Sequence, residues 1–153
     1  KAPISSKNFK DYVEKDFYNG TIFHQGIDEF MIQGGGFTPD GNKKPTNPPI
    51  VLESKNGLTN DLGTIAMART NIPDSATNQF FINLKDNSFL NYSSTRTDSL
   101  YLSSSSPGYA VFGKVVTGMD VINQIKMVKT GTRAGMPDWP VHDVLIKKIS
   151  LKK

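Results

Sequence analysis

Short apolar runs, separated by turn residues, are the feature that most limits how this chain can fold. Each run is about as long as one strand or shorter, and Gly, Asn, Asp or Pro lies close to its ends. The 13 Gly and nine Pro argue against a bundle of long helices, because both residues interrupt helices. The pattern predicts a β-rich body, either a barrel or a sandwich. The runs lie at residues 22–23, 30–32, 65–68, 80–82 and 110–112.

Two segments have helical spacing instead, at residues 5–15 and 117–126. The apolar residues of the first recur at i, i+3 and i+4, and those of the second lie three and four residues apart, so each segment is expected to form a short amphipathic helix. A serine is the expected N-cap of the first helix, and a last strand is expected near the end of the chain. The residues concerned are Ser5 and Ser6 for the cap, Phe9, Tyr12 and Val13 for the first helix, Val121, Ile122 and Ile125 for the second, and 144–149 for the strand.

Composition excludes several classes of protein. With 153 residues and 37% hydrophobic residues, the chain fits one domain with a packed core. The net charge of +4 comes from scattered Lys and Arg, and this does not indicate nucleic-acid binding. No apolar run reaches the length of about 18 residues that spans a bilayer. The chain has no Cys and two His, so thiol chemistry and a His-rich metal site are not expected.

Two loops stand out by composition. Residues 38–49 contain four prolines, which is too many for regular structure. Residues 91–108 are rich in Ser and are expected to form a polar excursion. Loops of this length are often functional, but a tolerated surface insertion is an equally good interpretation.

Five sequence blocks carry the functional information. The first reads FHQGIDEFMIQGGGFT over residues 23–38, and it resembles the signature of the cyclophilins, which are peptidyl-prolyl cis-trans isomerases. The remaining blocks resemble those of the same family in the same order, and their wording is similar to that of bacterial members. They are GTIAMART at 63–70, SATNQFFIN at 75–83, FL at 89–90 and YAVFGKV at 109–115.

The resemblance implies a mostly β fold over residues 1–153, a single cyclophilin-like domain. The family's architecture is a closed eight-stranded antiparallel barrel capped by two helices. Its first hairpin precedes the Ala2-Pro3 motif, so that hairpin is expected to be absent from the given chain. The resemblance also implies an isomerase that acts without a cofactor.

The chemistry of such an enzyme needs no nucleophile or metal. Rotation about an X-Pro bond must break amide resonance, a barrier of about 18–20 kcal/mol. A catalyst needs an apolar pocket for the proline ring and polar groups that favour the twisted state over both planar states. The apolar and amide side chains of the five blocks are of this kind.

By resemblance, the predicted catalytic residues are Gln25, Gln33 and Phe30, with Gln33 hydrogen-bonding the substrate backbone. The main chain at Ala68 and Arg69 would pair with the extended peptide before the proline. Tyr109 stands where many members carry His, and it keeps a ring with a polar tip. The remaining substrate-binding residues implied are Met31, Phe81, Leu90 and Tyr109 in the proline pocket and Phe89 at its rim.

Gln25 is the main departure, because the family's pattern has Arg at this position. A charged, forked donor is roughly twice as strong as a neutral one. Losing one such bond in the transition state is expected to slow the reaction roughly 30- to 1,000-fold. The chain is therefore expected to be an isomerase of attenuated turnover or, as the alternative, a non-catalytic proline-peptide-binding or chaperone module. Arg69 and Arg133 are the candidates for compensation.

Other residues have simpler interpretations. Adjacent rings on a strand point to opposite faces, so one of Phe80 and Phe81 can be core while the other lines a pocket. The resemblance assigns Phe80 to the core and Phe81 to the pocket. His24 is expected to be structural. The pair His142-Asp143 is interpreted as a surface contact, since no nucleophile completes a triad.

The expected partners are proline-containing segments of unfolded or folding proteins, with no nucleic acid and no membrane. Cyclosporin-type cyclic peptides are expected to bind weakly, because Phe89 replaces the Trp found in many members. A monomer is expected. The periplasm is the expected location of this basic, Cys-free chain, with the cytoplasm as the alternative.

Overall fold

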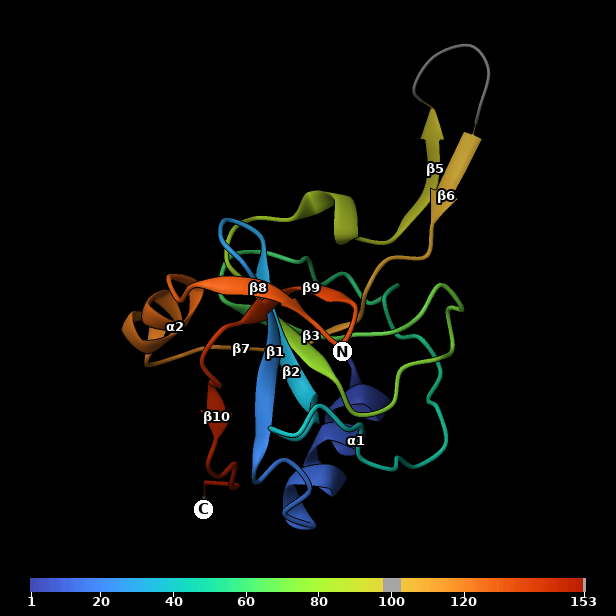
Figure 1. The fold of residues 1–153 in the computed structure, drawn as a ribbon. Helices are drawn as coiled ribbons and strands as arrows, with labels where there is room; N and C mark the ends of the chain where they lie inside the picture. Colours follow the sequence, from blue (N-terminus) through green and yellow to red (C-terminus); the bar gives the residue numbers. More distant parts are fainter. Residues whose placement is uncertain (98–102, 153) are drawn as a thin grey trace.

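The apolar runs form the strands of one central sheet in the computed structural model, which describes residues 1–97 and 103–152 (Figure 1). Every neighbouring pair in this sheet is antiparallel, in the order β10-β1-β2-β4-β3-β7. Its strands are β1 (Thr21–Ile27), β2 (Met31–Phe37), β3 (Thr64–Met67), β4 (Phe80–Asn83), β7 (Val111–Lys114) and β10 (Leu145–Ile146). The prediction of a β-rich body is therefore confirmed.

Both predicted helices are present, as α1 (Pro3–Glu14) and α2 (Met119–Lys126), and a 3₁₀ turn, η1 (Ser88–Leu90), follows β4. The expected serine cap of the first helix is wrong, because Ala2 is the N-cap and Pro3 begins the helix. Pro fits there, since a first-turn N–H has no partner within the helix. Ser5 instead lies inside α1, where its hydroxyl donates to Glu53 at 2.7 Å. Within the described ranges no helix is long and apolar enough to cross a membrane.

The expectation of a closed eight-stranded barrel is wrong. The central sheet is open, because β7 and β10 form its two edges and no other described strand pairs with either edge. β10 is too short to extend the sheet far, since only Thr21↔Ile146 and Ile22↔Leu145 pair. The expectation that a first hairpin is absent finds no support in the structure. The cyclophilin-type arrangement of a mostly β body with two helices is present.

Two hairpins lie outside the central sheet, and neither was predicted. β8 (Thr130–Arg133) pairs with β9 (Met136–Pro140), and β9 packs against β1. β5 (Ser93–Thr97) pairs with β6 (Ser103–Ser106) within the Ser-rich segment and extends away from the sheet (Figure 1). Both hairpins lack the alternation of apolar and polar residues that marks a half-buried strand, so their sequences resemble loops. The tip at 98–102 lies outside the described residues.

Phe80 and Phe81 lie on opposite faces of β4, as their alternation predicts. Phe80 packs in a core cluster with Tyr12, Val13 and Tyr18, against which the helix residue Phe9 also packs. Phe81 belongs to a separate cluster that contains Met31. One face of the sheet therefore builds the core under α1, and the other carries the cluster that contains Phe81 and Met31.

His24 is buried between aromatic rings, which agrees with its expected structural role. Its side chain is 5% exposed, and its ring lies 4.5 Å from the ring of Phe37 and 5.6 Å from that of Trp139. Among the described residues, His24 Nδ1 and Trp139 Nε1 have no hydrogen-bond partner. Burial, with a smaller contribution from the charge of Lys43, lowers the pKa of His24 from 6.5 to about 4. The folded state therefore favours the neutral ring.

This shift predicts a pH-dependent stability. The unfolded chain binds a proton at His24 near pH 6.5, whereas the folded chain binds it only near pH 4. The stabilisation of the folded state that comes from the neutral His24 ring is therefore fully present above pH 6.5. It is lost as the pH falls toward 4, by about 3 kcal/mol in the free energy of unfolding. Denaturant unfolding between pH 7 and 4 measures this loss. His24→Phe keeps a ring and should remove that part of the slope, and a slope unchanged by the substitution would contradict the assignment.

Candidate functional site

A small cavity of about 90 Å³ brings together most of the predicted site residues. Its walls come from five segments: β2 with the residue before it, the two residues after β3, β4, η1 and the loop before β7. The sheet register explains part of this grouping, because Phe81 pairs with Gln33 on one side and with Ala66 on the other. The lining residues are Phe30, Met31, Gln33, Ala68, Arg69, Phe81, Leu90 and Tyr109.

Two aromatic rings and the guanidinium of Arg69 form one side of the cavity. The rings of Phe81 and Tyr109 meet edge to face at 5.6 Å. The Arg69 guanidinium lies 4.4 Å from the centre of the Tyr109 ring. Its Nε and Nη2 donate to Gly108 O at 3.1 and 2.6 Å, and its Nη1 donates to Thr70 O at 2.8 Å. These bonds hold Arg69 as part of the wall.

Gln33 is held by a residue that the sequence analysis did not assign, Gln79. Gln33 Nε2 donates to Gln79 Oε1 at 2.9 Å. Gly36 makes this possible, because a Cβ at that position would lie 2.5 Å from the Gln79 side chain. The available signal was spacing, since Gln79 lies two residues before Phe81 and thus on the same face of the chain.

A second, larger hollow of about 590 Å³ adjoins the small cavity and shares Gln33, Ala68 and Arg69 with it. The rest of its lining is mostly polar and includes Lys43 and Lys44, with no carboxylate among the described lining residues. Together the two hollows form a groove that is apolar at one end and polar at the other. A bound chain could therefore place an apolar ring at one end and solvated groups at the other.

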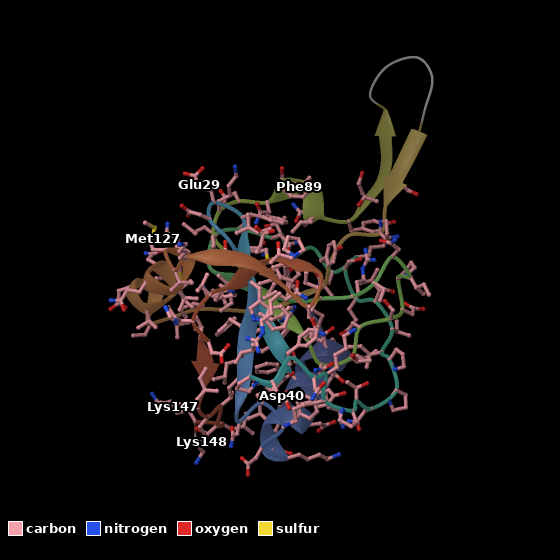
Figure 2. All side chains as sticks on the ribbon, viewed as in Figure 1. Glu29, Asp40, Phe89, Met127, Lys147 and Lys148 are labelled. Atoms are coloured by element: carbon pink, nitrogen blue, oxygen red, sulfur yellow. The ribbon has the colours of Figure 1, made fainter. Side chains whose placement is uncertain are left out.

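Phe89 lies at the edge of the small cavity and not within its lining. It is 58% exposed, and its ring stacks on Phe30 with centres 5.6 Å apart. Figure 2 shows Phe89 on η1, at the end of the molecule from which the β5–β6 hairpin extends. This position fits a residue at the rim.

Gln25, like Phe89, is a predicted site residue that lines neither hollow. It is half-buried on β1, and it pairs directly with Gln33 across the β1–β2 ladder. The neutral side chain of Gln25 therefore lies on the strand next to Gln33, and β2 separates it from Phe81 on β4.

Of the two arginines considered for compensation, only Arg69 lines the cavity. Arg133 is bound elsewhere, since it donates to the carbonyl of Pro39 and to Asp143 at 3.1 Å, and it packs over Trp139. This ion pair also accounts for Asp143, whose partner is Arg133 and not the neighbouring His142. In the part of the chain that the structure describes, no group of three or more His, Asp or Glu is placed to hold a metal ion.

Comparisons with known proteins agree on one family. The sequence model for "Cyclophilin type peptidyl-prolyl cis-trans isomerase/CLD" matches residues 1–151. The chain is 54% identical to a peptidyl-prolyl cis-trans isomerase of Acinetobacter baylyi, covering 99% of this chain and 76% of the relative. It is 52% identical to peptidyl-prolyl cis-trans isomerase B of Escherichia coli, covering 100% and 89%.

A solved structure is similar as well. It is a cyclophilin-type isomerase of Cryptosporidium parvum, crystallised in the presence of the dipeptide Ala-Pro. The TM-score is 0.79 at 26% identity, and the match covers 99% of this chain and 87% of that one.

Proposed function

The chain belongs to the cyclophilin-type peptidyl-prolyl cis-trans isomerases, and from this membership we propose how its groove acts on an X-Pro bond. The observation that carries the proposal is the small apolar cavity with the Gln33 amide in its wall. The proline ring of the substrate enters this cavity, between Met31, Phe81 and Tyr109. The ring is then fixed while the preceding carbonyl rotates.

The polar groups at the cavity wall hold the rest of the peptide. Gln33 is oriented by Gln79, so its amide is directed before substrate arrives, and it bonds the substrate backbone. Ala68 N–H already donates to Gln79 O at 3.0 Å. Neighbouring residues of an extended chain point their main-chain groups to opposite sides. The main-chain N–H and C=O of Arg69 therefore face away from Gln79 and bond the substrate residues before the proline.

Turnover is attenuated by Gln25. The resemblance places an Arg at this position, as a donor toward the prolyl nitrogen when amide conjugation is lost. Gln is shorter and uncharged, so its bond in the transition state is weaker. Arg69 does not replace the missing charge, since three of its nitrogen atoms already donate to main-chain carbonyls. Peptide binding is affected less than the rate, because the cavity itself is complete.

The substrates are proline-containing segments of unfolded or folding proteins, and the reaction assists their folding. An extended segment fits the groove, with its proline in the apolar end and the preceding residues in the larger polar hollow. The dipeptide Ala-Pro, in whose presence the Cryptosporidium parvum protein was crystallised, also contains an X-Pro bond. No observation favours the non-catalytic binding module over the isomerase.

The test is isomerisation of a short Ala-Pro peptide, with a cyclosporin-type cyclic peptide titrated as inhibitor. We expect acceleration by the wild-type protein and weak inhibition. Phe89→Trp adds ring area and an N–H donor at the rim, which should tighten inhibition about three- to tenfold. Binding of the Ala-Pro peptide without any acceleration would contradict the proposed reaction, and equal inhibition of both proteins would contradict the role of Phe89.

A further inference from the structure

Three buried asparagines form a connected group behind the proline cavity. Asn60, Asn83 and Asn87 are 1%, 0% and 2% exposed. Amide groups so far from water need hydrogen-bond partners in the protein, and among the described residues Asn87 Oδ1 is the one side-chain polar atom of the three asparagines without a partner. The partners include main-chain carbonyls of three residues that line the cavity, so this group connects directly to the site.

Asn60 holds one wall of the cavity. Its side-chain Nδ2 lies 3.1 Å from Leu90 O and 3.4 Å from Tyr109 O. The same nitrogen lies 3.1 Å from Asn91 Oδ1, to which the main-chain N–H of Asn60 also donates at 2.7 Å. Leu90 and Tyr109 flank the Ser-rich segment at 91–108. The side-chain amide of Asn60 therefore bonds the main chain at both ends of that segment.

The opposite wall is held through the other two asparagines. Asn83 Nδ2 donates to Asn60 Oδ1 at 3.1 Å, and Asn87 Nδ2 donates to Asn83 Oδ1 at 2.8 Å. Asn87 Nδ2 also donates to Phe30 O at 2.8 Å. A continuous chain of amides therefore runs from the carbonyl of Phe30 to those of Leu90 and Tyr109.

The sheet alone does not fix these walls. Phe30 lies before β2, Leu90 lies in η1 and Tyr109 lies before β7, so none of the three is in a strand. Main-chain bonds link Tyr109 N to Leu90 O and Leu84 N to Phe30 O, and two more run from Leu90 N to Asn87 O and from Asn87 N to Asn60 O. Among the described residues, none of these main-chain bonds joins Phe30 directly to Leu90 or Tyr109. The asparagine side chains supply the more direct route, because their amides bond the carbonyls of Phe30, Leu90 and Tyr109 themselves.

We propose that Asn60 is a positioning residue that, through Asn83 and Asn87, sets the width of the proline cavity. The inference rests on the proposed function of that cavity. Small displacements of groups that hold a substrate can cost up to about a hundredfold in rate. The asparagines therefore act on the reaction through Phe30, Leu90 and Tyr109, without touching the substrate.

The test removes the connection at each end, with Asn60→Ala and Asn87→Ala. We expect each variant to lower kcat/KM on an Ala-Pro peptide about tenfold, mainly by raising KM. A merely structural role would lower the folded fraction, and hence the apparent kcat, and would leave KM unchanged. Assays are made well below the melting temperature of each variant, so that the folded protein is measured. If Asn60→Ala does not fold, Asn87→Ala decides the question.

Thr21→Val is the matched control. Thr21 is completely buried and its hydroxyl donates to Tyr18 O at 2.6 Å, but it lines neither hollow. Thr21→Val should lower the melting temperature as the asparagine variants do, but its KM should equal that of the wild-type protein. Asparagine variants whose KM equals that of the control would overturn the proposal.

A measurement without substrate separates this inference from the proposed function. The methyl resonances of Leu90 in the free protein report its position against the Tyr109 side of the cavity. We expect them to move in Asn60→Ala and in Asn87→Ala, and to stay in place in Thr21→Val. Fixed resonances would overturn the positioning role even if the wild-type protein proved inactive, whereas inactivity together with moved resonances would contradict only the proposed function.

Discussion

Gln25→Arg is expected to raise kcat/KM on an Ala-Pro peptide roughly 30- to 1,000-fold. The physical reason is the bond made as the amide twists. When the prolyl nitrogen loses conjugation it becomes a better acceptor, and a charged guanidinium stabilises that state more than a neutral amide does. Because the bond forms only in the transition state, the gain should appear in kcat, with KM little changed.

The position of Gln25 supports this expectation. Gln25 lies directly opposite Gln33 on the neighbouring strand and is half-buried. An Arg side chain is longer than Gln, so it can extend past Gln33 toward the cavity that Gln25 does not line. Stopped-flow isomerisation of the same peptide by the two proteins gives the comparison.

Two control variants separate charge from shape at this position. Gln25→Lys adds a charge without the planar fork, and it should recover only part of the gain. Gln25→Leu removes the polar group, and its rate should be only slightly lower than that of the wild-type protein. A wild-type rate already equal to that of Gln25→Arg would show that Gln25 does not attenuate turnover.

Most of the fold follows from local pattern in the sequence. The apolar runs and the two amphipathic segments mark the strands of the central sheet and both helices. The β5–β6 and β8–β9 hairpins have no such pattern, because polar strands outside a sheet core lack apolar alternation. Closure of the sheet was also predicted wrongly. Whether edge strands meet depends on long-range pairing, and β10 pairs with β1 at only two positions.

The site was predicted through whole sequence blocks and not through single residues. In isolation Phe30, Met31 and Phe81 are most simply explained as core, and only their order along the chain indicates a cavity. Asn60 and Asn87 gave no signal, because Asn is typical of turns and its burial is decided by tertiary contacts. For Gln79 the sequence offers only its spacing to Phe81, and it does not reveal the bond to Gln33, which is 46 residues away.

Gln33→Leu is expected to lower kcat/KM about a hundredfold, the loss found when one preorganised donor is removed from a polar site. Leu has nearly the shape of Gln, so the wall of the cavity stays closed while its amide is lost. The variant should fold well, because Gln33 is only half-buried and water can reach the Gln79 group that loses its partner. Thermal unfolding and the isomerisation assay together distinguish a lost interaction from a lost fold.

The Gln79 variants show whether the Gln33 amide must be oriented as well as present. Gln79→Leu removes the acceptor at 2.9 Å and leaves Gln33 free to rotate, which should cost about five- to tenfold in kcat/KM. Gln79→Glu keeps an acceptor at the same place and should stay close to the wild-type rate. Because Gln33 and Gln79 act through one bond, Gln79→Leu should add almost nothing to Gln33→Leu in the double variant. Fully additive losses would mean that Gln79 acts on the substrate directly, through the larger hollow that it also lines.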